Sequence, residues 1–249
     1  MAKQSGLGDN FYVGVFDLSG DTNSLGAITS SRATIDVTGI DKSAIERIHG
    51  IKDGGFEFTT YFNPSAGKAH PVLKALPTTD VVCSYFRGTT QGKPAASCIG
   101  KQINYDPVRS DSGEFTFKTS VQGNGYGLEW GVMLTDGIRT DTSATSPATG
   151  YDTLASAAFG GQAYLHVFSV TGTSVTVTIE DSADNITFIP IASPMAFAAV
   201  NGAATSTQRI FISNTSTIRR YVRVKTAGTF SNAQFAVNFV KNAEAGVVF

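Results

Sequence analysis

The stretch SAIERIHGIKDGGFEFTTYFN, residues 43–63, joins two different hydrophobic patterns. In its first part Ile45 and Ile48 lie three residues apart and Gly50 follows, which is typical of a short helix that ends at a glycine. From Gly55 onward aromatic residues alternate with polar ones, the period-two pattern of a half-buried strand. The stretch therefore predicts a helix over residues 43–49, followed by a strand over residues 55–62.

Most of the remaining chain has the strand pattern. Strands are expected at residues 11–19, 32–38, 81–87, 97–105, 113–122, 126–134, 162–170, 175–182, 186–191, 208–214, 219–226 and 232–240. A second short helical piece is expected at residues 70–75, with Pro71 in its first turn. The predicted fold class is mainly β: an N-terminal antiparallel β-sandwich or barrel with one short flanking helix, and a C-terminal β-sandwich of jelly-roll or immunoglobulin-like type.

The composition changes at TDTSATSPATG, residues 140–150, where no hydrophobic period is left. This predicts an N-terminal domain over residues 1–140 with a flexible N-terminal arm, a linker over residues 141–152 and an outer domain over residues 153–249. Residues 1–150 carry 13 Lys and Arg against 15 Asp and Glu, and the remainder carries 6 against 5. Neither part is basic enough to indicate stable binding of nucleic acid.

The segment after Met1 lacks the apolar core of a signal peptide, and no run approaches the roughly 18 apolar residues of a membrane span. A protein made and folded in the cytoplasm is therefore expected. In that compartment Cys83 and Cys98 are expected to be reduced and buried, although two neighbouring strands could also bring them together.

The residues expected in an enzyme are scattered. His49, His70 and His166 lie far apart, and the sequence has no HExxH, Gly-x-Ser-x-Gly or phosphate-loop motif. The glycines of DGG (53–55) and GNGYG (123–127) are interpreted as turns with positive φ, and the acidic segments at 20–24 and 181–185 as Asx turns. We therefore expect no catalysis, no metal and no cofactor. A hydrolase whose site is assembled from distant residues remains a further hypothesis.

Four long blocks of the first part carry a family resemblance: NFYVGVFDLSGDTNSLG (10–26), DVTGIDKSAIERIHGIKDGGFEFTTYFNP (36–64), AHPVLKALPTTDVVCSYFRGTTQGKPAASCIGKQINYDP (69–107) and NGYGLEWG (124–131). In this order they resemble the major tail proteins, or tail tube proteins, of long non-contractile-tailed bacteriophages, particularly those that infect actinobacteria. The resemblance implies a tail-tube-type β-sandwich whose subunits form hexameric rings, stacked into the tube through which genomic DNA passes. It also implies that the predicted helix packs on the sandwich through Ile45 and Ile48.

The resemblance further implies a virion protein, assembled in the host cytoplasm, whose partners are itself, a tape-measure protein, tail terminator and tail-tip proteins, and transiently the DNA in the lumen. A lumen rich in Lys and Arg would bind phosphates, so it should be neutral or acidic, and Glu57 and Glu114 are the lumen candidates. Contacts between subunits are expected at the N-terminal arm, the loop 87–97 and the last residues of the sequence, namely at Leu7, Asn10, Phe11, Gln91, Lys93, Val248 and Phe249.

The second part offers an alternative function. In RRYVRVKT (219–226), a strand would place Arg219, Tyr221 and Arg223 on one face, although a solvated outer face explains the same pattern. With Tyr164, this face could contact a host-surface glycan or a polyanion. The alternative hypothesis is therefore a carbohydrate-binding virion surface protein that acts through its C-terminal sandwich.

Overall fold

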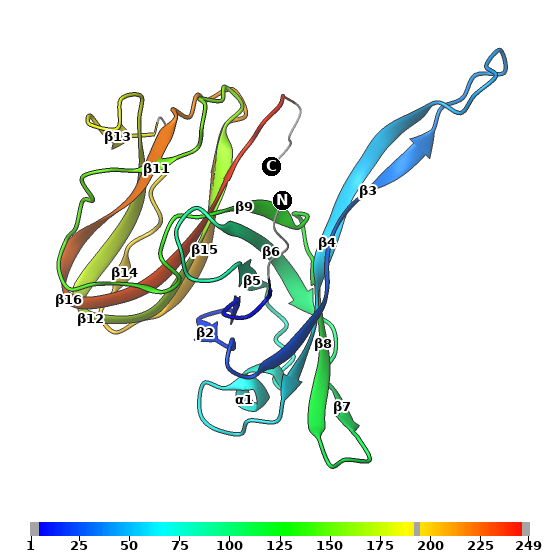
Figure 1. Ribbon diagram of the computed structural model, residues 1–249, viewed down its shortest axis with the longest axis horizontal. Coiled ribbons are helices and arrows are strands. Elements are labelled where there is room, and N and C mark those ends of the chain that lie inside the picture. Colours follow the sequence, from blue (N-terminus) through cyan, green and yellow to red (C-terminus); the bar gives the residue numbers. More distant parts are fainter. Residues whose placement is uncertain (1–4, 192–194, 246–249) are drawn as a thin grey trace. The chain divides into compact units, whose positions relative to one another are not determined.

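The computed structural model describes residues 5–191 and 195–245, and it confirms the predicted mainly-β class: antiparallel strands with one short helix among the described residues (Figure 1). The chain divides into two compact units. Unit 1 comprises Met1–Gly20, Ser84–Ser97 and Trp130–Phe249, and unit 2 comprises Asp21–Cys83 and Cys98–Glu129. This division differs from the predicted boundary near residue 140, because the N-terminal strands belong to the same unit as the C-terminal ones.

The strands of unit 1 are β1 (Asn10–Val13), β2 (Phe16–Asp17), β10 (Arg139–Asp141), β11 (Tyr151–Asp152), β12 (Gly161–Ser182), β13 (Ile189–Pro190), β14 (Val200–Asn201), β15 (Ser206–Ile212) and β16 (Tyr221–Lys241). Unit 2 contains β3 (Thr22–Asp36), β4 (Arg47–Tyr61), α1 (Ala69–Leu73), β7 (Asp106–Arg109) and β8 (Phe115–Gly123). Three further strands have residues in both units: β5 (Val81–Phe86), β6 (Pro94–Gln102) and β9 (Glu129–Met133).

Unit 1 is built on two very long strands, β12 and β16, which pair with each other from Gly161↔Lys241 to Ser182↔Tyr221. The sequence predicted two shorter strands in each region, separated by TGTS and by AGTFS. The structure instead passes through both glycine segments with shifts of register, and Gly172 and Gly228 have φ of 149° and 121°. Such bulges bend a strand without ending it. The aliphatic and aromatic side chains of β12 and β16 form the main core of this unit.

The predicted linker is fixed to the β12–β16 pair. Both β10 and β11 pair with β16. The Arg139 guanidinium binds both carboxylate oxygens of Asp141 at 2.8 Å, and the Thr226 hydroxyl donates to Asp141 at 2.6 Å. Thr145 exchanges two backbone hydrogen bonds with Thr226. The polar composition of residues 141–152 therefore reflects a segment with no apolar side to bury. The segment is nevertheless held against β16 by hydrogen bonds.

Unit 2 is a sheet in which β4 lies between β3 and β8, with β7 and part of β6 also paired to β8. The predicted alternation is confirmed, since Phe56, Phe58 and Thr60 are buried whereas Glu57 is exposed. The DGG interpretation is wrong. Gly55 lies within β4, where a Cβ atom would stand 2.1 Å from the Val121 carbonyl oxygen, so close strand approach requires the glycine. In GNGYG the turn is correct for Gly125, which has φ of 77°.

The predicted helix at residues 43–49 is wrong, and the second one is confirmed as α1. Residues 47–49 begin β4, and Ile48 pairs with Ile35 of β3. Ile45 and Ile48 are 58% and 52% exposed, so they do not pack on a sandwich. Their spacing of three results from a loop that leads into a strand. Cys83 and Cys98 are both buried and free, as expected.

Candidate functional site

The distal part of the β3–β4 hairpin, residues 31–53, is called here the distal ribbon. Its two strands pair from Ser31↔Asp53 to Asp36↔Arg47, whereas the pairing of β4 with β8 begins only at Gly55. Every residue from 29 to 49 is exposed. Figure 1 shows the ribbon running away from the remainder of unit 2. At about 3.4 Å per residue, the eight residues before Gly55 carry it roughly 25 Å beyond that sheet.

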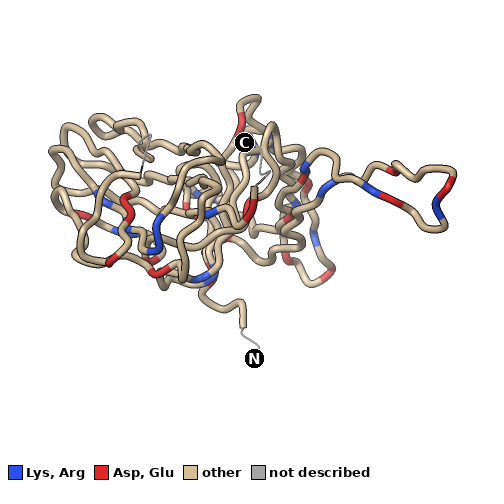
Figure 2. Tube along the Cα trace, turned by 90° about the horizontal axis from the view of Figure 1, so that it is seen from above, with Lys and Arg blue, Asp and Glu red and all other residues tan. Residues whose placement is uncertain are grey.

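The ribbon has one apolar and one polar face. Ile35 and Ile48 are direct cross-strand partners and share a face, and alternation places Val37 beside them. On the opposite face Asp36 pairs with Arg47, and Thr34 pairs with His49. Figure 2 shows acidic and basic residues interspersed along this hairpin. Exposed apolar surface of this kind is typical of sites that contact another protein.

A tight turn closes the ribbon. The Lys42 amide donates to the Gly39 carbonyl oxygen at 3.1 Å, which puts Ile40 and Asp41 at the centre of a β-turn. The base of the loop is held by Thr38, whose hydroxyl donates to Asp36 at 2.6 Å and accepts from the Glu46 amide at 2.9 Å. The Thr38 hydroxyl, together with the Thr38 backbone amide that donates to the same carboxylate at 2.9 Å, lowers the pKa of Asp36. The turn is therefore ordered, although Ile40 at its tip is fully exposed.

One edge of the ribbon has no neighbouring strand among the described residues. In the described chain, β3 pairs with β4 alone, so its outer edge has a free row of amide and carbonyl groups. An isolated two-stranded ribbon is marginal in water, and free edges of this kind promote pairing with another chain. The sequence predicted the strand at 32–38, but not that it pairs with residues 47–53. The candidate contact residues that sequence reasoning missed are therefore the exposed Ile35, Val37 and Ile40.

The N-terminal arm predicted to be loose is attached to unit 1 from Ser5 onward. Asp9 accepts from the Arg87 guanidinium at 2.6 Å and from the Tyr85 hydroxyl at 2.5 Å. Burial and the Asp9 carboxylate raise the pKa of Tyr85 to about 12. The Asn10 amide donates to the Gly88 carbonyl oxygen at 2.8 Å. Among the predicted contact residues, Phe11 is buried and Asn10 holds its own chain, whereas Leu7 is 89% exposed.

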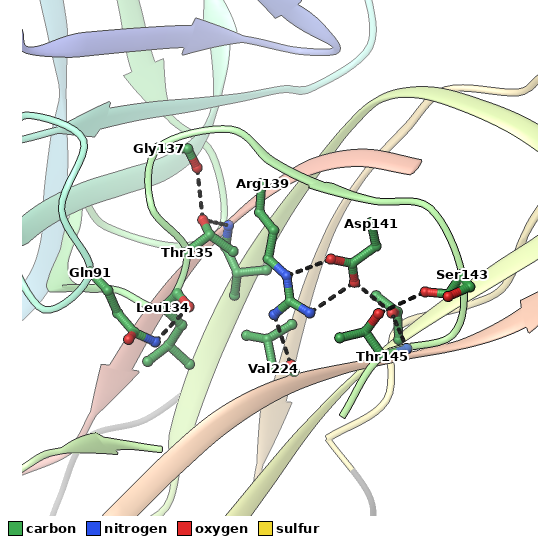
Figure 3. A network of polar contacts seen from close by, with 11 residues as sticks. Gln91, Leu134, Thr135, Gly137, Arg139, Asp141, Ser143, Thr145 and Val224 are labelled. Atoms are coloured by element: carbon green, nitrogen blue, oxygen red, sulfur yellow. Dashed lines mark hydrogen bonds and ion pairs between the residues drawn. The ribbon is translucent and has the colours of Figure 1, made fainter. Parts of the chain in front are cut away.

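The loop 87–97 also forms hydrogen bonds within its own unit. The Gln91 amide side chain donates to the Leu134 carbonyl oxygen at 2.9 Å, and its backbone amide donates to Asp136 at 2.7 Å (Figure 3 shows the first of these). Lys93 is exposed. Val248 and Phe249 lie outside the described residues. Leu7, Gln91 and Lys93 are all exposed, and Gln91 also forms hydrogen bonds within its own unit, so contact between subunits at these residues stays a prediction.

The lumen candidates are both exposed. Glu57 faces away from the core of β4, and it pairs with Ala27 of β3 and Ser120 of β8. Lys118 is exposed on β8, where it pairs with Thr59 and lies on the same face of the sheet as Glu57. Glu114 accepts from the Asn23 amide at 3.3 Å. The exposed face of this sheet therefore carries both signs of charge.

The proposed glycan or polyanion contact does not form as predicted. Tyr164 is completely buried, so its ring cannot serve as a surface platform. Arg219 forms an ion pair with Asp181 at 2.9 Å, and Arg223 binds Glu180 at 2.6 Å. Tyr221 is partly exposed, with the neighbouring Arg220 guanidinium 5.1 Å from its ring centre. Arg219, which precedes β16, and Arg223 on β16 therefore neutralise buried carboxylates, which alternation along a strand could not reveal.

This pairing makes a testable prediction for Arg223. Replacement by alanine leaves the buried Glu180 with Lys225 alone, so Arg223→Ala should lower the free energy of unfolding by about 3 kcal/mol in urea titrations. Arg220→Ala is the control, because its ion pair with Asp152 is exposed to water and should contribute little to stability. Retention on a heparin column should not change. If Arg223→Ala weakened retention on heparin without changing stability, Arg223 would instead be a contact residue for polyanions.

His166 heads a buried chain of hydrogen bonds in unit 1. Its Nδ1 lies 2.7 Å from the Gly14 carbonyl oxygen, which can only accept, so Nδ1 carries the hydrogen. Nε2 therefore accepts from the Ser84 hydroxyl at 2.7 Å, Ser84 accepts from Ser97 at 2.6 Å, and Ser97 accepts from the Asn238 amide at 2.8 Å. Burial lowers the pKa of His166 to about 4.

The His166–Ser84 contact resembles a nucleophile and its base, yet both side chains are 0% exposed. A substrate could not reach the serine in this arrangement, and the chain of hydrogen bonds satisfies buried polar groups. His166 is thus a buried strand residue whose two ring nitrogens both have hydrogen-bond partners. His49 lies on the distal ribbon, and His70 lies in an aromatic cluster with Phe62 and Tyr105 of unit 2.

The described residues contain no group of three or more His, Cys, Asp or Glu side chains that could hold a metal ion. They also contain no helix with the length and apolar character that a membrane span needs.

No family model matches the chain, and no curated protein matches it. Among solved structures, the chain is similar to the Dit protein (gp 19.1) of phage SPP1, a hub adsorption apparatus component of phages that infect Gram-positive bacteria. The identity is 11%, the TM-score is 0.32, and 94% of this chain and 99% of that one are covered. Two structures of the phage p2 baseplate in its activated conformation, with strontium and with calcium, each have 8% identity and a TM-score of 0.36. They cover 96% and 94% of this chain, and 99% and 98% of theirs. Likeness at these TM-scores does not assign the chain to a family.

Proposed function

We propose that this chain is a structural subunit of a bacteriophage tail, and that it self-assembles into stacked hexameric rings that form the tube for genomic DNA. The distal ribbon is the observation that carries the proposal. An apolar face bearing Ile35 and Ile48, together with a free β3 edge, favours contact with a second protein surface. The ordered sequence blocks that resemble tail tube proteins support a second copy of the chain as that surface.

The electrostatics of the chain fit this role. A tube must let DNA pass without binding it, and every phosphate neutralised by Lys or Arg adds affinity. The net charge of −1, and the mixture of Glu57 and Lys118 on one sheet face, avoid such a basic lining. Glu57 and Glu114 remain the proposed lumen residues. The tape-measure, tail terminator and tail-tip proteins remain the proposed partners, and the virion tail remains the proposed location.

Self-assembly is tested by electron microscopy of the negatively stained protein over a concentration series, with light scattering for mass. Rings or tubes should appear as concentration rises, because the ribbon can be covered only in the assembly. A protein that stays monomeric at every concentration, and also after addition of preformed tails, would contradict the proposal. The glycan-binding alternative is not advanced, because Tyr164 is buried and Arg219 and Arg223 are paired.

A further inference from the structure

A pocket of about 340 Å³ opens in unit 1 beside the end of β16. It is lined by Pro94, Trp130, Gly131, Val132, Tyr151, Thr153, Leu154, Phe239 and Lys241. Trp130 is the one tryptophan of the sequence, and it is 47% exposed. The volume lies at the lower end of the range for binding pockets, and apolar walls with a few polar groups are typical of them.

One wall of the pocket contains a strained residue. Leu154 has φ of 73°, a left-handed conformation that is unfavourable for leucine, and its side chain is 80% exposed. The conformation is held by its amide, which donates to Asp152 at 2.8 Å, and by the adjacent Thr153 amide, which donates to the Arg220 carbonyl oxygen at 2.9 Å. The strained backbone of Leu154 therefore places its aliphatic side chain in water, beside the pocket that contains Trp130. Strain of this kind is concentrated at functional sites.

The pocket also contains a positive charge. The Lys241 ammonium donates to the backbone and side-chain oxygens of Thr153, at 3.1 and 2.5 Å, and to the Ala155 carbonyl oxygen. All three acceptors are neutral. The nearby Asp152 carboxylate interacts electrostatically with Lys241, although its direct ion pair is with Arg220. A ligand that brings an aliphatic group and a carboxylate therefore matches both the walls and the charge.

The tip of the distal ribbon presents this combination. Ile40 is fully exposed at the centre of the turn, and the Asp41 carboxylate follows it. The Asp41 side chain is 76% exposed, and its Lys42 neighbour approaches only to 3.9 Å. Binding of the ribbon tip to another surface would therefore cost Ile40 no buried contact, and it would cost Asp41 only its long contact with Lys42.

We propose that the Trp130 pocket of one copy receives the ribbon tip of a second copy, with Ile40 between Trp130 and Leu154 and Asp41 facing Lys241. The inference rests on the proposed self-assembly and names the surface that receives the ribbon. The contact is head-to-tail, since tip and pocket are different surfaces, and such contacts generate rings or filaments. Because the Lys241 hydrogens are already used, Asp41 contributes charge attraction and not a new hydrogen bond.

Disulfide formation between copies tests the contact. One protein carries Ile40→Cys and another carries Leu154→Cys, and the native Cys83 and Cys98 are buried. Mixing and mild oxidation should give a covalent pair between the two proteins. The control pairs Leu154→Cys with Ile186→Cys, an exposed isoleucine elsewhere, and should give less than a tenth of that product. Scattering of the same samples reports assembly.

The outcomes separate the contact from the proposed function. Assemblies that form without the 40–154 product would overturn the pocket assignment and leave self-assembly standing. A 40–154 disulfide that forms inside a doubly substituted monomer would overturn the assignment to a second copy. The absence of any assembly in the unsubstituted protein would overturn the proposed function, and the contact with it.

Trp130 fluorescence gives an independent measurement without cysteines. Its emission should move to shorter wavelength when the unsubstituted protein assembles, because the ring leaves water. Asp41→Lys places two positive charges together and should raise the assembly concentration about tenfold. The matched control Asp111→Lys, on another exposed turn, should change it less than threefold. Emission that does not change on assembly, or equal effects of the two lysine variants, would overturn the contact.

Discussion

Replacing Ile35 and Ile48 together by threonine should raise the concentration at which the protein assembles by about thirtyfold. Both side chains are about half exposed in the single chain, so burial in an assembly covers the other half. At about 2 kcal/mol for a fully buried isoleucine, each contributes about 1 kcal/mol, and about 2 kcal/mol corresponds to a thirtyfold change. Threonine keeps the branched β-carbon and the preference for strand, so the ribbon itself should persist.

The measurement is the onset of light scattering against concentration, together with the melting temperature of the unassembled protein. The melting temperature should stay within about a degree, because neither isoleucine belongs to a core. Ile186 and Ile189 are exposed in unit 1, and their double replacement by threonine is the matched control that should leave assembly unchanged. Equal loss of assembly in both double variants would mean that general surface polarity, and not the ribbon, controls association.

The sequence allowed much of the fold to be predicted because alternation records which face of a strand is buried. Phe56 and Phe58 on β4, and Phe117 and Val121 on β8, are buried as their period indicates. Alternation does not record whether a glycine ends a strand or bends it. The segments around Gly172 and Gly228 were therefore interpreted as turns, although the pairing of β12 with β16 continues through both.

The error at residues 43–49 has a related cause. A spacing of three between Ile45 and Ile48 fits one face of a helix, but it also arises where a loop joins a strand. The deciding contact is the pairing of Ile48 with Ile35, thirteen residues earlier, across a turn whose glycine and aspartate were visible in the sequence. A hairpin interpretation would have required the strand at 32–38 to be paired with the segment that follows it.

The candidate sites could be inferred from sequence only where they are local. The ribbon is continuous in the chain, so its isoleucines were visible, although they were assigned to another structure. Trp130, Leu154 and Lys241 come together only because β9, β11 and β16 meet, and no sequence spacing encodes that. The same holds for Ser84, Ser97 and Asn238, which complete the hydrogen bonds of His166 across more than 150 residues.

Acid should destabilise the fold through His166. Burial lowers its pKa from an ordinary 6.5 to about 4, so between these values the unfolded chain binds a proton that the folded chain excludes. Stability from this group is therefore present above pH 6.5 and decreases as pH falls toward 4. The shift corresponds to about 3 kcal/mol. Below pH 4 the folded state binds the proton as well, and the loss levels off.

Comparison with His166→Gln isolates this effect, because the carboxylates titrate in both proteins and cancel in the difference. Glutamine has an amide that can donate to Gly14 and an oxygen that can accept from Ser84, but it cannot become charged. Urea titrations should show an advantage of the unsubstituted protein over the variant that shrinks by about 3 kcal/mol from pH 7 to pH 4. His49→Gln, on the exposed ribbon, should retain the original pH dependence. If the His166→Gln difference is the same at both pH values, the imidazole is not held neutral in the core, and the direction derived for its chain of hydrogen bonds is wrong.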